Sequence, residues 1–225
     1  MKHQKQLLVF DWDGTLMDSQ ARIIHCFHLA IRDMDMAFRT ADQVSNIIGL
    51  GFREALLALY PELGDDFHED FVDCYRNYFL AEDVAPSDFF EGVVQMLEDL
   101  NGQDYFMAIA TGKGRRGLDM ALEQHDVKHL FHASRCADET HSKPHPQMLE
   151  DLMDYFAVEK DHTLMIGDTE YDLQMASNAD VHSLAVSYGV HDKQRLLDCK
   201  PLACFENTKE LHTWLNESVI NNQSL

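Results

Sequence analysis

The stretch Leu7–Ser19, LLVFDWDGTLMDS, passes from four apolar residues directly to two carboxylates, and this change decides the expected fold. A short apolar run that stops at a turn signal is typical of a fully buried strand. Asp11 and Asp13 follow the run at once, and Gly14 opens a turn. The stretch therefore predicts a buried strand that presents acidic groups at its carboxyl end.

Three further segments repeat this arrangement. Apolar residues run through Tyr105–Ala110, Thr163–Ile166 and Ser183–Val186, and each run ends at a polar cluster. Helical patterns separate the runs, and strands that alternate with helices are typical of a doubly wound, mostly parallel α/β sheet. Such sheets bind ligands at the carboxyl ends of their strands, so we expect all four polar clusters at one edge.

The stretch 18–85 interrupts the alternation, because it contains helix-period patterns and no convincing strand. Apolar residues recur at the spacing of one helical face in two segments: Ile23, Ile24, Phe27, Ile31 and Met34, then Phe67, Phe71, Cys74, Tyr75, Tyr78 and Phe79. Thr40 and Gln43 have the spacing of a capping box. We expect a small all-helical domain over 18–85, inserted through hinges near 16–19 and 84–87 into a core of residues 1–17 and 86–225.

The charge of the chain argues against two classes of partner. With 18 Lys and Arg against 39 Asp and Glu, the formal net charge is −21, which repels nucleic acids and acidic membranes. The five cysteines are scattered without CxxC spacing, so neither a disulfide framework nor a zinc site is indicated. Because no segment resembles a signal peptide or approaches the roughly 20 apolar residues of a membrane span, we expect a cytoplasmic protein. The oligomeric state is left open.

Asp11 and Asp13 are the first candidates for chemistry. A carboxylate held at the end of a strand, beside backbone amides released by a turn, is placed for use as a nucleophile. A second carboxylate nearby makes one of the two hold its proton more easily, which suits a nucleophile with a general acid/base beside it. The same Asp-x-Asp-Gly pattern also fits an ordinary turn, so this motif alone leaves both interpretations open.

The segment AIATGKG ends a second strand with Thr111 and Gly112 and leads into a helix. Free amides and the positive end of a helix dipole bind phosphate groups, although Thr111 could also serve as a helix N-cap. The segment is not a Walker loop, because Met107 stands where the first glycine belongs; GLGFRE is not a dinucleotide fingerprint, because Glu54 replaces a small residue. We expect a phosphate site at Thr111 and Gly112.

Lys143 lies in a stiffened stretch of backbone, because Pro144 and Pro146 follow it before a helix begins. A lysine positioned in this way could steady the charge of Asp11 and of a bound phosphate. A solvated surface lysine is the alternative. We place Lys143 in the expected phosphate site.

The fourth cluster, LMIGDTEYDLQMA, places Asp168 directly after a strand and Asp172 four residues later. Residues one helical turn apart project into one small volume, and a pocket of carboxylate oxygens selects a hard cation. With the side chain of Asp11 and the backbone carbonyl of Asp13, these acids predict a Mg²⁺ site. Asp168 alone could instead cap the following helix.

In this order, the motifs DWDGT, ATGK, KPHP and GDTEYD resemble those of the haloacid dehalogenase superfamily of phosphohydrolases, over essentially the whole chain. The helical insert is similar to the C1-type cap of that superfamily, and the chain looks most like phosphoglycolate phosphatases and their relatives. The resemblance implies that Asp11 attacks phosphorus to give an aspartyl-phosphate. It also implies that Asp13 protonates the leaving oxygen and then activates water.

The resemblance implies roles for the other clusters as well. Thr111 and Lys143 would hold the phosphoryl group, and Asp168 would anchor Mg²⁺ with Asp172 nearby. The expected function is a Mg²⁺-dependent phosphatase acting on a small phosphorylated metabolite. A phosphosugar mutase or pyrophosphatase on the same core is an alternative, and so is a receiver-like signalling module that stores the aspartyl-phosphate.

Three residues are candidates for contact with the leaving group or for its selection. Arg53 and Lys113 could bind it, with an ordinary surface role as the alternative for each. In FFEGV, Glu91 stands where phosphoglycolate phosphatases commonly carry proline. A carboxylate at that place would disfavour a leaving group that is itself a carboxylate, which argues against phosphoglycolate.

Overall fold

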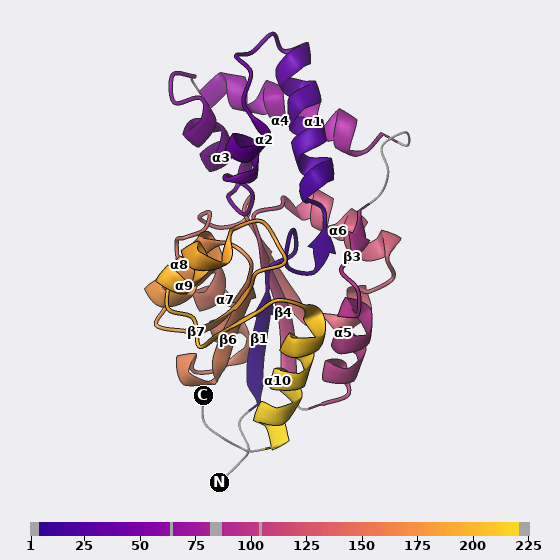
Figure 1. Cartoon of the computed structure of the whole chain (residues 1–225), viewed down its shortest axis with the longest axis vertical. Helices are drawn as coiled ribbons and strands as arrows, with labels where there is room; N and C mark the ends of the chain where they lie inside the picture. Colours follow the sequence, from indigo (N-terminus) through magenta and orange to yellow (C-terminus); the bar gives the residue numbers. More distant parts are fainter. Residues whose placement is uncertain (1–4, 64, 82–86, 104, 221–225) are drawn as a thin grey trace.

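The computed structural model describes residues 5–63, 65–81, 87–103 and 105–220. A six-stranded sheet runs through its lower part (Figure 1), with the strand order β5-β4-β1-β6-β7-β8 and every neighbouring pair parallel. The strands are β1 (Gln6–Phe10), β4 (Tyr105–Thr111), β5 (Ala133–Cys136), β6 (Thr163–Gly167), β7 (His182–Val186) and β8 (Ala203–Phe205). The expected doubly wound α/β fold is confirmed, because the order reverses beside β1 as it does in that class.

The two outermost strands, β5 and β8, were not expected. The segment ASRC of β5 is half-buried over three of its four residues, and β8 has only three residues. Edge strands need no continuous apolar run, because one side of the strand has no neighbour to bury it. The apolar-run criterion therefore identified only the central strands β4, β1, β6 and β7.

Helices cover both faces of the sheet. Alternate residues of β1 point to opposite sides: Leu8 and Phe10 join a core with α5 (Val93–Asn101), α6 (Arg115–Gln124) and α10 (Thr208–Ile220). Leu7 and Val9 join a second core with α7 (Gln147–Phe156) and α8 (Glu170–Asn178). The short helix α9 (Lys193–Asp198) packs beside β7, and two 3₁₀ turns, Lys128–Leu130 and Lys160–His162, complete the connections. Burial on both faces explains why β1 reads as an unbroken apolar run.

The insert forms a separate helical unit above the sheet (Figure 1). Its helices are α1 (Gln20–Asp33), α2 (Ala41–Ser45), α3 (Phe52–Leu59) and α4 (Asp65–Phe79). They share a hydrophobic core of their own that includes Phe27, Leu56, Phe71 and Tyr75. The chain enters and leaves the unit through one antiparallel ribbon, because β2 (Met17–Asp18) pairs with β3 (Asp88–Phe89).

The local expectations for the insert agree with this structure where it can be compared. The capping box is present, since Thr40 Oγ1 accepts from the Gln43 amide and the Gln43 side chain accepts from the Thr40 amide. The side chain of Phe67 and most of the second expected hinge, 84–86, lie outside the described residues. Within the described ranges, none of the helices combines the length and the apolar character that crossing a bilayer requires.

Candidate active site

The turn after β1 brings the first acidic motif against the end of β6. The Asp11 amide donates to the Ile166 carbonyl at 2.9 Å, which continues the strand pairing by one residue. Gly14 then adopts φ +89°, and a Cβ on it would lie 2.2 Å from Asp168 Oδ2. Only glycine fits there, because the backbone of the DWDGT motif lies directly against the carboxylate of Asp168.

Three carboxylates and one ammonium gather at this edge of the sheet. Oxygens of Asp11, Asp168 and Asp172 all lie within 4.8 Å of one another. Lys143 Nζ lies 2.7 Å from Asp11 Oδ1 and 2.6 Å from Asp172 Oδ1. No more than 1% of any of these four residues is exposed. The structure thus brings together side chains that are up to 161 positions apart in the chain.

The ionisation of these groups follows from burial and from their neighbours. Burial raises the pKa of Asp11 well above its usual range, and the charges of Asp172 and Asp168 raise it further while Lys143 opposes them. Burial, followed by the charge of Asp172, raises the pKa of Asp168 to about 7. Burial alone would lower the pKa of Lys143, but Asp11 and Asp172 reverse that effect and raise it. The two carboxylates thus favour the charged form of Lys143.

A divalent cation fits this set of ligands. Three carboxylates face one ammonium, so the ionised cluster carries an excess of two negative charges in a buried place. Carboxylate oxygens are the ligands that Mg²⁺ prefers, and a bound cation reverses the penalty of placing like charges together. Among the described residues this is the group of acids that could hold a metal ion, and the side chain of Asp13 is not part of it.

Four residues that the sequence reasoning did not single out hold the acids in place. Asp168 accepts hydrogen bonds from the Thr15 hydroxyl at 2.7 Å and the Val190 amide at 2.8 Å. Asp172 Oδ2 accepts from the amide and the hydroxyl of Thr169, and the Tyr188 hydroxyl donates to the carbonyl of Thr15.

The capping of α8 removes the alternative role that the sequence left open for Asp168. The N-cap of this helix is Thr169, not Asp168. Thr169 and Asp172 form a capping box, a pattern that the spacing T-x-x-D could have revealed. Asp168 is consequently free of the capping role and uses its two oxygens for hydrogen bonds inside the site.

Asp13 stands beside this cluster and makes different contacts. Its carboxylate lies 2.8 Å from Lys113 Nζ and accepts a hydrogen bond from the Ser19 hydroxyl at 2.7 Å. The side chain is 13% exposed. Lys113 Nζ also lies 4.9 Å from the centre of the Phe79 ring on α4. Asp13 is therefore linked to the insert through Ser19 and through Lys113, whereas the ion pair that the structure describes for Asp11 is with Lys143 of the core.

The loop after β4 lies against the insert. Thr111 Oγ1 accepts from the Lys113 amide, which leaves the hydroxyl proton available for a ligand, and α6 begins only at Arg115 with Gly114 as its N-cap. A Cβ on Gly112 would lie 2.5 Å from the Leu50 carbonyl oxygen. Glycine at this position thus permits the backbone of the insert to approach the expected phosphate site.

The loop 46–51 of the insert is hydrogen-bonded to the core at three places. The Gly51 amide donates to Ser142 Oγ at 2.8 Å. The Tyr171 hydroxyl donates to the Asn46 carbonyl at 2.9 Å, and Arg195 donates to Asn46 Oδ1 at 2.5 Å. The insert is therefore closed over the edge of the sheet in this structure.

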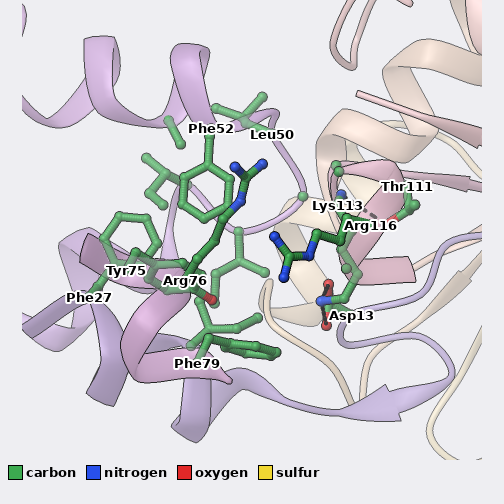
Figure 2. A pocket seen from close by; sticks show the side chains of 18 of the residues that line it. Asp13, Phe27, Leu50, Phe52, Tyr75, Arg76, Phe79, Thr111, Lys113 and Arg116 are labelled. Carbon is green, nitrogen blue, oxygen red and sulfur yellow. Dashed lines mark hydrogen bonds and ion pairs between the residues drawn. The ribbon is translucent and has the colours of Figure 1, made fainter. Parts of the chain in front are cut away.

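A cavity lies between the two parts and includes Asp11, Asp13, Thr111, Gly112 and Lys113 in its lining. It encloses about 870 Å³ of space outside protein atoms, part of which is open solvent. Figure 2 shows it with aromatic side chains of the insert on one side and Asp13 and Lys113 on the other. Two arginines that the sequence reasoning did not identify, Arg76 and Arg116, also line it.

The other two leaving-group candidates lie elsewhere. Arg53 lines a neighbouring surface cleft together with Glu54 and Glu69. Glu91 is exposed and lines a different hollow, together with Tyr188 and Glu206, and it is not part of the cavity lining. The structure does not bring Glu91 to the cavity, so its charge gives no argument against a carboxylate on the leaving group.

Comparison with known proteins gives consistent results. The model of the family described as haloacid dehalogenase-like hydrolase matches residues 8–186. A protein of Dickeya dadantii (strain 3937) named Probable phosphatase IndB is 33% identical over 213 residues, 92% of each chain. A phosphoglycolate phosphatase of Aliivibrio fischeri is 31% identical and covers 87% of this chain and 90% of its own.

The fold also has close counterparts among solved structures. A hydrolase from Pseudomonas syringae superimposes with a TM-score of 0.85, over 95% of this chain and 99% of the other. Its sequence identity of 22% limits this comparison to the fold. The match over nearly the full length of both chains includes the helical insert as well as the sheet.

Proposed function

The chain belongs to the haloacid dehalogenase-like hydrolase family, and we propose that it is a Mg²⁺-dependent phosphatase that hydrolyses a small phosphorylated metabolite through an aspartyl-phosphate. One observation carries the proposal: Asp11 sits at the end of the central strand, 2.7 Å from Lys143 Nζ and two residues from a second carboxylate on the same cavity. Residues 18–85 would act as a cap over the core formed by 1–17 and 86–225.

In the first half-reaction, an oxygen of Asp11 forms a bond to phosphorus while the bond from phosphorus to the ester oxygen breaks. Asp13 donates a proton to that ester oxygen, which leaves as an alcohol. Lys143, the Thr111 hydroxyl and the amides beginning at Gly112 stabilise the charge on the three phosphoryl oxygens. The closed loop 46–51 excludes bulk water during this step.

In the second half-reaction, Asp13 removes a proton from one water molecule, and the hydroxide attacks phosphorus. The bond between Asp11 and phosphorus then breaks, and inorganic phosphate leaves. The carboxylate of Asp13 is placed for both steps, because it lines the same cavity as Asp11 and its side chain is 13% exposed.

Asp11, Asp168 and Asp172 would hold Mg²⁺, with the backbone carbonyl of Asp13 as a further candidate ligand. When bound, the ion supplies positive charge that balances the transferring phosphoryl group. This chain's own residues contribute the rest: Thr15 and Val190 hold Asp168, and Lys143 orients Asp11.

The test compares turnover with stoichiometric labelling. We expect steady hydrolysis of p-nitrophenyl phosphate with Mg²⁺, and loss of most turnover in Asp13→Asn with Mg²⁺ affinity retained, because only the side chain of Asp13 transfers protons. One phosphoryl group bound per chain without turnover would instead indicate a receiver-like module. Exchange of phosphate between sugar positions without its release would indicate a mutase, and unchanged turnover in Asp13→Asn would remove Asp13 from the mechanism.

A further inference from the structure

One wall of the cavity is an aromatic surface contributed by the insert. It contains Phe27, Phe52, Tyr75 and Phe79. The rings of Phe27 and Phe52 are stacked with their centres 5.9 Å apart, and Tyr75 meets Phe52 edge to face at 4.8 Å. Such a wall can bury the apolar surface of a ring or a hydrocarbon chain. It offers few hydrogen-bonding groups to the hydroxyl groups of a sugar.

Two arginines enter the same cavity from opposite parts of the molecule. Figure 2 shows Arg76, from α4 of the insert, and Arg116, from α6 of the core, directed into the space between the two parts. Arg76 contacts Asp73 at 3.6 Å on the surface. For Arg116 the described part of the chain supplies neither a hydrogen bond nor an ion pair.

The charge of the lining makes these arginines informative. Its carboxylates are Asp11 and Asp13, and its cations are Arg76, Lys113 and Arg116. Lys113 is already paired with Asp13 at 2.8 Å. In a chain of net charge −21, two guanidinium groups that share a cavity form a local positive site, and guanidinium groups favour carboxylates and phosphates.

On the basis of the proposed phosphatase function, we infer that the preferred substrate has a leaving group with two features. Its apolar, ring-sized body packs on the aromatic wall of the insert, and a second anionic group binds between Arg76 and Arg116. The aromatic wall thus disfavours esters of short polar alcohols. Among apolar esters, the two arginines favour those whose leaving group carries a second anion. These residues determine specificity and take no part in the bond changes at phosphorus.

The test uses three phosphate esters with similar leaving-group reactivity: ethyl phosphate, 2-phenylethyl phosphate and 2-(4-carboxyphenyl)ethyl phosphate. We expect kcat/KM to rise about tenfold from the first to the second, because apolar area is buried. A further rise of about tenfold is expected from the second to the third, because an anion meets two guanidinium groups. Equal kcat/KM for all three esters would overturn the inference while leaving the phosphatase function intact.

Variants separate the two features. Arg76→Ala and Arg116→Ala should each remove most of the increase in kcat/KM that the carboxyl group gives, and should leave kcat/KM for 2-phenylethyl phosphate unchanged. Compared with Arg116→Ala, Arg116→Lys should recover part of that increase. Phe52→Leu should reduce only the increase in kcat/KM from ethyl phosphate to 2-phenylethyl phosphate, which the ring gives. Arg32→Ala is the matched control, because Arg32 is an exposed arginine paired with Asp33 on α1, away from the cavity. If the double variant Arg76→Ala/Arg116→Ala still hydrolyses the carboxylated ester with a higher kcat/KM than 2-phenylethyl phosphate, the role of the arginines is overturned.

Binding provides a measurement that does not need turnover. The phosphonates in which CH₂ replaces the ester oxygen of the same three compounds are titrated into the wild-type chain with Mg²⁺ present. We expect Kd to fall in the same order as kcat/KM rises. If no ester is hydrolysed, the proposed function fails, and the order of these Kd values still decides for or against the two-part leaving group.

Discussion

The buried cluster around Lys143 and the cavity under the insert meet at Asp11 but are built in opposite ways. In the cluster, four charged side chains are no more than 1% exposed, and hydrogen bonds from the core hold them. In the cavity, the wall is aromatic and the arginines are partly exposed, with Arg76 at 43%. For the proposed phosphatase, this difference assigns the chemistry to the buried cluster. It assigns the selection of the leaving group to side chains of the cavity, which can vary without disturbing the cluster.

The most severe test of the buried cluster is removal of its nucleophile. Asp11→Asn keeps the size of the side chain but cannot form an acyl phosphate, so we expect kcat to fall by about 10⁴-fold or more. Steady-state kinetics with p-nitrophenyl phosphate measure the loss. The free energy of unfolding without metal should not fall, because one of three mutually repelling buried carboxylates is gone. A variant with more than a hundredth of wild-type kcat would contradict the assignment of Asp11.

The border between the two regions is tested by a single methyl group. Gly112→Ala places a Cβ 2.5 Å from the Leu50 carbonyl and 2.6 Å from the Gly49 carbonyl, so the loop of the insert must move. We expect kcat/KM to fall by about 10²-fold, because small displacements at a reacting centre are costly, and hydrogen exchange at 49–51 to accelerate. Gly102→Ala is the control, since its Cβ would meet nothing closer than 3.5 Å. Equal kinetics in the two variants would show that loop contact is irrelevant to activity.

Metal removal distinguishes the buried carboxylate cluster from the acidic residues on the surface of the chain. Saturating Mg²⁺ should raise the free energy of unfolding of the wild-type chain by about 2 kcal/mol, because the ion binds only the folded cluster. In Asp172→Asn this increment should largely disappear, whereas Asp154→Asn, at an exposed position on α7, should retain it. Thermal melts with Mg²⁺ and with EDTA provide the comparison. The same increment in both variants would place the metal elsewhere.

The smallest effect is expected for an ion pair outside both regions. Glu139 accepts two hydrogen bonds from Arg115, which hold its pKa below the ordinary value of 4.5. A lowered pKa stabilises the folded chain above pH 4.5, and this contribution is lost as the pH falls through the folded value. Glu139→Gln should therefore cost less than about 1 kcal/mol at pH 7, since the pair is about one-third exposed, and less at pH 3, where the carboxyl group is already protonated in the unfolded chain. Urea unfolding at both pH values checks this, and a pH-independent cost would assign the effect to packing.

The sequence was sufficient wherever a local rule decides the structure. The central strands were found because burial on both faces demands unbroken apolar runs, and the insert because its apolar residues follow a helical period. Asp11, Thr111 and Asp168 were placed at one edge because parallel strands of a doubly wound sheet share the direction of their carboxyl ends. The capping box at Thr40 follows equally from spacing alone.

Other features depend on contacts between distant parts of the chain. Thr15 and Asp168 are hydrogen-bonded across 153 positions, and nothing in the sequence near either residue indicates the other. Arg76 and Arg116 look like ordinary surface arginines on two helices until the insert closes over the sheet. Glu91 was expected near the substrate, but the course of the backbone after β3 places it in another hollow.

By itself, then, the sequence determined the type of sheet, and it predicted a helical insert and a set of acids for chemistry, because these depend on the period and order of residues along the chain. Only the tertiary structure decided that Lys143 lies between Asp11 and Asp172, that Lys113 joins Asp13 to the insert, and that arginines and aromatic rings share one cavity. The physical reason is that the strength of a charge pair and the burial of a ring depend on distances of a few ångströms, which are set by the packing of the insert on the core.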